Sequence, residues 1–265
     1  MFTRVEAVAL SIVALAAAAI VAAYLAGTLG LTLHPAVILF VAAAASAVAL
    51  LVLWRRTATA HEDAVAFAAI VASVLTWLLW LAWPHLLPIG SGPDLTHHLL
   101  LIDFIERTGH LVRDATLAGR LGEMVDYTPG SHLLVVLAGR WIGSDGLHAA
   151  HAIVAGSVAL KAGLVFLIAL RCLPADRVRT PFAIAAALLL VVPRAYFEGS
   201  FAQNWFLAQV VSELFAVAMW WAIVAWDQQP SHLAAAIFAC AGSGAFLSWP
   251  VWVGPPIAAH GLGAG

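Results

Sequence analysis

Carboxylate and imidazole side chains that could act on protons gather in one stretch of this sequence. Asp94, His97 and His98 lie in GPDLTHHLL, and half of the 14 acidic residues fall between Gly90 and Gly146. In a helix over residues 94–108, positions i, i+3 and i+4 share one face. Carboxylates and imidazoles accept protons and bind divalent metal ions. We therefore predict that these three residues are catalytic, with Asp94 as a general base or as the anchor of a metal ion.

The same residue types also suit roles without chemistry. Asp is a preferred helix N-cap, and capping would already occupy the Asp94 carboxylate. His97 and His98 would then be ordinary surface residues, since these three positions complete no metal-ligand set. The residues alone leave both interpretations open.

A second helix start follows in the segment DYTPGSHLL, which begins at Asp126. Thr128 suits the N-cap and Pro129 the first helical position, where a missing N–H costs nothing. The free N–H groups of Gly130, Ser131 and His132 would then face an anion such as a phosphate at the positive end of the helix dipole. An ordinary capped helix start explains the same residues equally well.

The composition is that of an integral membrane protein. Hydrophobic residues make up 63% of the 265 residues and charged residues only 10%, far from the mixture of soluble domains. The net charge of -2 and the lack of a basic patch argue against a nucleic-acid partner. Cys172 and Cys240 have neither metal-ligand spacing nor a disulfide framework around them.

Apolar runs of the length that crosses a membrane as a helix recur along the chain. We predict one transmembrane domain, an all-α polytopic bundle of about seven spans. The spans are placed at residues 5–27, 35–54, 64–86, 147–170, 181–196, 205–226 and 232–252. Residues 87–146 form a loop with two helices at the membrane interface, the second of which is too short to span and could instead be re-entrant.

The arginines of the short loops predict the orientation, because positively charged loops stay in the cytoplasm. Six arginines fall on one side if the N-terminus is inside: Arg4, Arg55, Arg56, Arg171, Arg177 and Arg179. Only Arg194 lies in a short connector on the opposite side. The loop over residues 87–146 is therefore predicted to be extracytoplasmic.

Two ionisable residues lie inside predicted spans, where a charge is costly unless it is paired or faces a cavity. These are Lys161 and Glu213. They could pair with each other if both side chains bend, or Lys161 could extend to the cytoplasmic headgroups. A relay through the pair would suit a membrane transporter or flippase.

The motifs D-x-x-H-H at Asp94 and Y-x-P-G-x-H at Tyr127, in an outward loop after an early span, resemble those of the GT-C superfamily of bacterial membrane glycosyltransferases. The resemblance covers roughly residues 64–252. It implies that a sugar passes from a polyprenyl-phosphate donor to a glycan, lipid or protein acceptor at the outer face of the bacterial cytoplasmic membrane. Members generally have more spans, so these residues would be an N-terminal fragment or a minimal member.

The resemblance also implies roles for individual residues. Asp94 would correspond to the functional loop aspartate, with His97, His98, Tyr127 and His132 lining the donor or acceptor site. The lipid phosphate would be held by the helix start at 128–132 and by Arg113 or Arg120. Sugar hydroxyls would be bound by three residues on the outer side, Glu198, Gln203 and Asn204. A divalent cation, Mg²⁺ or Mn²⁺, is compatible with this site but is not required.

The sequence thus supports a glycosyltransferase first and a transporter or flippase second. A structural subunit of a larger membrane assembly is the third hypothesis. Substitution of Asp94 or Glu213 would distinguish the three, since the enzyme requires Asp94, the transporter requires Glu213 and the structural subunit requires neither.

Overall fold

The computed structural model describes residues 2–58, 61–88 and 93–263, and it confirms the all-α prediction. Within these residues, five helices are long and apolar enough to cross a membrane. They are α1 (Arg4–Thr28), α2 (Pro35–Trp54), α3 (His61–Ala82), α7 (Gly146–Cys172) and α10 (Leu207–Gln228). The shorter helix α11 (His232–Ser248) is also apolar.

Shorter elements complete the chain. Between α3 and α7 lie α4 (Pro93–Thr108), the 3-10 turn η1 (Ala115–Leu117), α5 (Ala118–Leu121), the 3-10 turn η2 (Gly122–Val125) and α6 (Gly130–Trp141). Between α7 and α10 lie α8 (Arg179–Leu188), α9 (Arg194–Glu198) and the π-helical turn η3 (Gly199–Gln203). The turn η4 (Pro250–Val253) and helix α12 (Gly254–Gly263) end the described chain.

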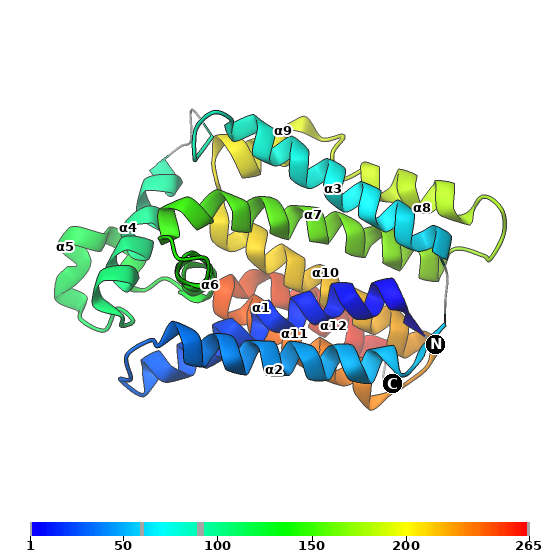
Figure 1. The fold of residues 1–265 in the computed structure, drawn as a ribbon, viewed down its shortest axis with the longest axis horizontal. Coiled ribbons are helices and arrows are strands. Elements are labelled where there is room, and N and C mark those ends of the chain that lie inside the picture. Colours follow the sequence, from blue (N-terminus) through cyan, green and yellow to red (C-terminus); the bar gives the residue numbers. More distant parts are fainter. Residues whose placement is uncertain (1, 59–60, 89–92, 264–265) are drawn as a thin grey trace.

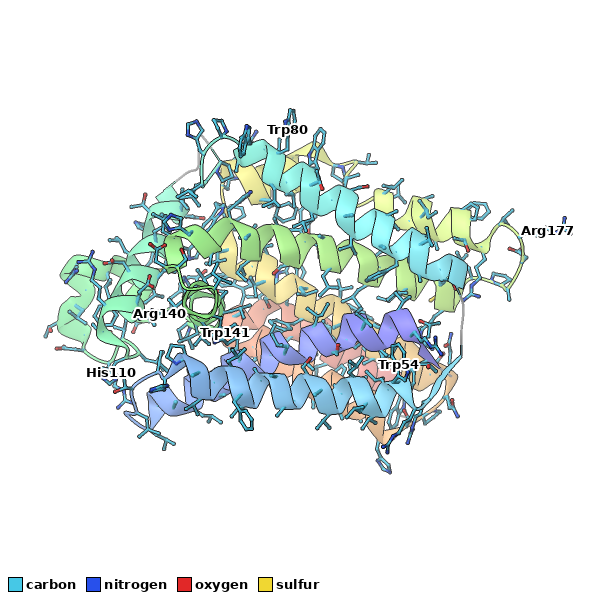
Figure 2. The ribbon with its side chains drawn as sticks, viewed as in Figure 1. Trp54, Trp80, His110, Arg140, Trp141 and Arg177 are labelled. Atoms are coloured by element: carbon cyan, nitrogen blue, oxygen red, sulfur yellow. The ribbon has the colours of Figure 1, made fainter. Side chains whose placement is uncertain are left out.

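The long helices run side by side, and the segment from α4 to α6 lies across one end of them (Figure 1). The opposite end carries the N-terminus, where β1 (Phe2–Thr3) pairs in parallel with β2 (Thr57–Ala58). Charged side chains mark both ends, with His110 and Arg140 at the first and Arg177 at the second (Figure 2). The polar insertion is therefore a cap on one end of an apolar bundle.

Helix α7 is the centre of the bundle and packs against α3, α6, α8 and α10. Small residues let its neighbours approach closely, as expected of helices that pack in a membrane. At Gly163, a methyl group would lie only 2.5 Å from the ring of Phe67 on α3. The Ala- and Gly-rich composition of α7 thus serves close packing.

Two predicted spans differ from the structure. Residues 181–196 do not form one continuous helix, because α8 ends at Leu188 and α9 begins at Arg194. Pro193 lies in the break, and proline disfavours helical geometry in the residue before it and supplies no N–H. The last predicted span, 232–252, ends at Ser248 for the same reason, since Pro250 follows.

Helix α6 differs from a helix that lies along a membrane surface. Every residue from Gly130 to Leu137 is buried, among α1, α4, α7 and α10. A surface helix would expose one of its faces. The interior position of α6 agrees better with the re-entrant alternative.

A charged cluster closes the end of the bundle that carries the N-terminus. Thr3 and Glu6 form a capping box at the start of α1. The Glu6 carboxylate is 2% exposed and accepts two hydrogen bonds from Arg171, at 2.5 and 3.0 Å. The indole N–H of Trp221 on α10 donates to the same carboxylate at 3.0 Å. Helices α1, α7 and α10 therefore meet at one buried ion pair.

Candidate functional site

Helix α4 presents a single buried face to the bundle. His98, Leu101, Ile102 and Ile105 are all buried, at the i, i+3, i+4 and i+7 spacing of one helix face. The predicted helix over 94–108 is confirmed to within one residue by α4. His98 is thus held in place by the apolar side chains that follow it.

His97 and His98 turn to different partners. His97 Nδ1 lies 2.9 Å from Glu123 Oε1 at the surface, whereas His98 Nδ1 lies 2.9 Å from His132 Nε2 in the interior. Asp94 is the second residue of α4 and half-buried. Among the described residues, the Asp94 carboxylate makes no hydrogen bond, which leaves it free to act on a ligand.

The predicted metal set is not assembled in the part of the chain that the structure describes. No group of three or more His, Cys, Asp or Glu side chains there could hold a metal ion. His97 and His98 cannot both face an ion beside Asp94 while they bind Glu123 and His132. The site is therefore better suited to proton transfer and hydrogen bonding than to metal binding.

A buried chain of hydrogen bonds joins α4 to the start of α6. Beyond the contact between the two imidazoles, His132 Nδ1 lies 3.3 Å from the Ser131 hydroxyl. Burial and the neighbouring His97 lower the pKa of His98 to about 4, and burial next to His98 lowers the pKa of His132. Both rings are therefore neutral at pH 7, where each can donate one hydrogen bond and accept another.

Tyr127 connects this histidine pair to its surroundings. Its ring packs edge-on against His98 and His132, with centroids 5.5 and 5.7 Å away, and lies 5.6 Å from the ring of Trp249. Burial, followed by the charges of Asp94 and Glu123, raises the pKa of Tyr127 to about 12. The phenol thus remains a hydrogen-bond donor throughout the physiological range.

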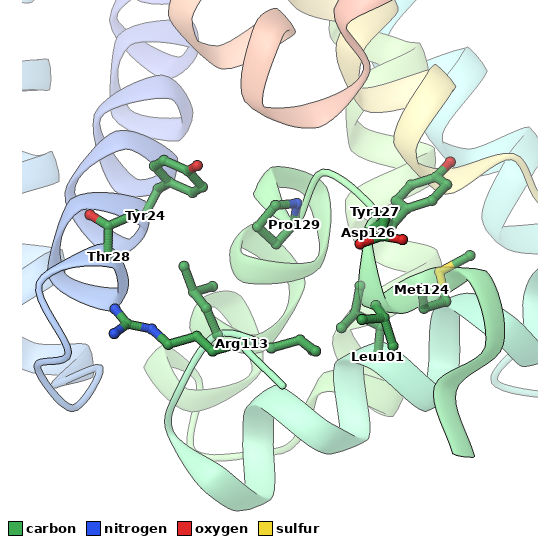
Figure 3. Close-up of a pocket in the computed structure, with 11 residues that line it drawn as sticks. Tyr24, Thr28, Leu101, Arg113, Met124, Asp126, Tyr127 and Pro129 are labelled. Carbon is green, nitrogen blue, oxygen red and sulfur yellow. The ribbon is translucent and has the colours of Figure 1, made fainter. Parts of the chain in front are cut away.

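Tyr127 also lines a cavity of about 330 Å³ between α1 and the α4–α6 segment. Arg113 and Asp126 supply its charged groups, and Tyr24 and Thr28 line it from α1 (Figure 3). Figure 3 shows Arg113 and Tyr127 on opposite sides of this space. The Arg113 guanidinium donates to the Gly27 carbonyl, which fixes it at the end of α1. The cavity thus combines one fixed cation with a phenol and a carboxylate.

The start of α6 departs from the prediction. Pro129 is the N-cap and makes no side-chain capping bond, while the Thr128 hydroxyl donates to the Ser248 carbonyl at 2.7 Å. A tertiary partner on α11 thus replaces the expected local cap. Ser131 and His132 are fully buried, and a methyl group at Gly130 would lie 2.6 Å from the Leu247 carbonyl. Helix α11 therefore packs against this helix start, and Pro129 at the N-cap lines the cavity.

The remaining predicted residues lie apart from the cavity. Arg120 is exposed on α5 and does not line the cavity, so Arg113 is the arginine placed there. Gln203 and Asn204 are exposed near the start of α10. Glu198 ends α9, and its side chain lies outside what the structure describes.

Sequence reasoning missed Asp126, Tyr24 and the ring of Trp205, which lies 6.2 Å from that of His98. Asp126 directly precedes Tyr127, so the prediction of Tyr127 as a site residue could have drawn attention to Asp126. Tyr24 breaks an otherwise aliphatic run in the first span, which is a weaker signal. Trp205 carries no local signal, because an aromatic residue near the end of a span is typical of membrane proteins.

The two intramembrane charges pair with each other. Lys161 Nζ lies 2.6 Å from Glu213 Oε2, and the side chains are 4% and 6% exposed. The Tyr196 hydroxyl binds both groups, at 2.9 Å from Lys161 Nζ, and Gln209 donates to Glu213 Oε1 at 3.3 Å. Of the two alternatives that the sequence left open for Lys161, the structure shows the pairing with Glu213.

Comparison of the chain with models of protein families, with curated proteins and with solved structures finds no match. The geometry of the residues described above therefore carries the functional argument.

Proposed function

We propose that this protein is a membrane glycosyltransferase of the GT-C type, which moves a sugar from a polyprenyl-phosphate donor to an acceptor hydroxyl. One observation carries the proposal: His98 of α4 comes together with Tyr127 and His132, and Tyr127, which feels the charge of Asp94, lines a cavity that also holds Arg113. A carboxylate can serve as a general base in sugar transfer, and a fixed cation can stabilise the phosphate that leaves.

Each group has a chemical task in this proposal. Asp94 accepts the proton of the acceptor hydroxyl as the hydroxyl oxygen forms a bond to the anomeric carbon of the sugar. The bond between that carbon and the phosphate oxygen breaks, and the lipid phosphate leaves with the electron pair. Arg113 stabilises the charge that develops on the phosphate, since a guanidinium pairs well with phosphate oxygens.

The proposal places the α4–α6 segment on the outer face of a bacterial cytoplasmic membrane. The arginine distribution of the short loops supports this orientation. The proposal also predicts a hydrophobic sugar donor, because the cavity lies at the end of apolar helices.

Transfer of a radiolabelled sugar from polyprenyl phosphate to membrane acceptors tests the proposal. We expect Asp94→Asn to lower the transfer rate at least a hundredfold, because general-base catalysis contributes about 10²- to 10⁴-fold. Asp103→Asn is the matched control, since Asp103 lies on the same helix and pairs with exposed Arg107. Full activity of the Asp94 variant would remove that residue from the mechanism.

A transporter or flippase is the second candidate function, favoured by the buried contact between Lys161 and Glu213. It predicts that Glu213→Gln abolishes substrate movement into membrane vesicles while Asp94→Asn has no effect. The glycosyltransferase predicts the reverse for sugar transfer. If neither substitution changes either activity, the third hypothesis, a structural subunit, remains.

A further inference from the structure

The backbone before α10 has an unusual conformation. The turn η3 is π-helical, and the N–H of Asn204 donates to the Gly199 carbonyl at 2.8 Å. Trp205 follows with a φ of 55°, a left-handed conformation that bulky residues rarely adopt. Both π-helical turns and left-handed non-glycine residues concentrate at functional sites. The segment is thus built to hold the Trp205 side chain in one particular place.

The Trp205 side chain is fully buried, at 0% exposure, and its indole N–H has no hydrogen-bond partner among the described residues. A buried tryptophan normally finds an acceptor for this group, since an unpaired buried donor is costly. The unpaired N–H of Trp205 is therefore a donor that a ligand could use.

The rings next to Trp205 lead to the cavity. His98 lies between the rings of Trp205 and Tyr127, with centroids 6.2 and 5.5 Å away. Tyr127 lines the cavity and is half-buried, so it is the ring that must turn aside to admit a ligand. Nδ1 of His98 is taken by His132, which leaves Nε2 as the second polar group available on this route.

We propose that Trp205 is a sugar-binding residue, whose indole N–H donates a hydrogen bond to one hydroxyl of the transferred sugar. The Tyr127 ring packs against a C–H face of that sugar, and His98 Nε2 binds a second hydroxyl. This proposal rests on the proposed glycosyltransferase function and names the group that selects the sugar.

The charges favour a neutral hydroxyl over the phosphate as the partner of Trp205. The ring next to Trp205 is the neutral imidazole of His98, whose other neighbour is the phenol of Tyr127, and Arg113 lies across the cavity from Tyr127. Lys161 lies 5.0 Å from the ring of Phe201 in η3, but its ammonium is already bound to Glu213. Among the side chains that the structure describes, a phosphate at Trp205 would meet no free cation, while a hydroxyl needs none.

Equilibrium binding to the detergent-solubilised protein tests this inference. The probes are farnesyl phosphate and its esters with mannose, glucose, galactose and arabinose. We expect at least one ester to bind more tightly than farnesyl phosphate. Trp205→Phe keeps an aromatic ring but removes the N–H, and we expect it to weaken binding of that ester about tenfold without changing the affinity for farnesyl phosphate.

Trp252→Phe is the matched control, because the indole N–H of Trp252 is also buried and unpaired but its ring makes no contact with His98. It should bind the ester as the wild type does. Removal of an unpaired donor should also leave the melting temperature of each variant within a few degrees of the wild type. If Trp205→Phe does not fold, the NMR signals of the indole N–H groups in the ¹⁵N-tryptophan-labelled wild type test the proposal instead. The chemical shift of one of these signals must change when the ester is added but not when farnesyl phosphate is added.

The outcomes separate the two proposals. If no probe binds, the glycosyltransferase and the sugar-binding role of Trp205 both fall. If farnesyl phosphate binds as tightly as every ester, or if Trp205→Phe keeps the preference for the ester, only the role of Trp205 is wrong. If Trp205→Phe weakens both probes equally, Trp205 shapes the cavity and does not bind the sugar.

Discussion

His98 Nδ1 and His132 Nε2 lie 2.9 Å apart. This contact joins helices α4 and α6 through two residues that are 34 positions apart in the sequence. One ring must donate and the other accept, so the hydrogen bond is lost when both rings are protonated and neither can accept. Protonation of both rings would place two like charges in contact inside the protein. The attachment of α4 to α6 therefore depends on pH.

The first prediction is a loss of stability in acid. The pKa of His98 is about 4 in the folded protein and about 6.5 in the unfolded chain, so the unfolded chain binds more protons between these values. The contribution to stability is complete above pH 6.5 and falls as the pH drops towards 4, by on the order of 3 kcal/mol from His98 alone. Melting temperatures in detergent across this range measure it.

The double variant H98F/H132F provides the comparison, because it removes both titrating rings and leaves no unpaired imidazole. We expect its melting temperature to fall less steeply below pH 6.5 than that of the wild type. His110→Gln, at an exposed position in the same segment, should keep the wild-type slope. Equal slopes in the wild type and the double variant would show that the pair does not couple pH to stability.

The second prediction concerns the intramembrane ion pair. Glu213→Gln leaves the Lys161 ammonium buried without a counter-charge and should lower the free energy of unfolding by roughly 3–5 kcal/mol. The double variant K161M/E213L should recover most of this loss, since an apolar pair avoids both desolvation costs. Chemical denaturation in detergent measures the free energy of unfolding of both variants. If Glu213→Gln is as stable as the wild type while K161M/E213L is destabilised, this explanation is wrong.

The third prediction tests the packing of α6 against α11. A methyl group at Gly130 would lie 2.6 Å from the Leu247 carbonyl, so Gly130→Ala must displace backbone and should lower the melting temperature by several degrees. No atom lies within 4 Å of the same position at Gly156 in α7. Gly156→Ala should therefore be neutral or stabilising, since alanine is the better helix former. Equal effects of the two substitutions would refute the close contact.

The fourth prediction separates the two candidate phosphate ligands. Arg113 lines the cavity, and Arg120 is exposed on α5 away from it. Arg113→Gln should weaken the binding of farnesyl phosphate about tenfold, the usual scale of a charged hydrogen bond. Arg120→Gln should leave it unchanged at constant salt concentration. The opposite result would move the phosphate out of the cavity and onto the surface of α5.

Local rules were sufficient for much of the fold. Helix α4 ends at Thr108, just before Gly109 with a φ of 67°, as the glycine stop signal predicts. The pairing of Lys161 with Glu213 could be expected because burial leaves a charge few alternatives in an apolar bundle. Pro193 was a sequence signal for the break after Leu188. It was overlooked because the residues around it form a continuous hydrophobic run.

The candidate site was less predictable, because its contacts join segments that are distant in sequence. His98 was a candidate from its own motif, yet its partner could have been any polar group on the facing helices. The choice of Ser248 as the partner of Thr128 depends on how α11 packs, since a local cap is the usual expectation. The left-handed Trp205 is set by packing around η3 and by no local preference for that conformation.

The ion pair at the N-terminal end also constrains the order in which the chain can assemble. Glu6 leaves the ribosome 165 residues before Arg171, and Trp221 of α10 follows later still. Until Arg171 is synthesised, the carboxylate on α1 has no cation to bind, and a lone charge is expelled from the apolar interior. Helix α1 can therefore reach its final position only after α7 and α10 have been made, so insertion and packing are separate steps in the biogenesis of this protein.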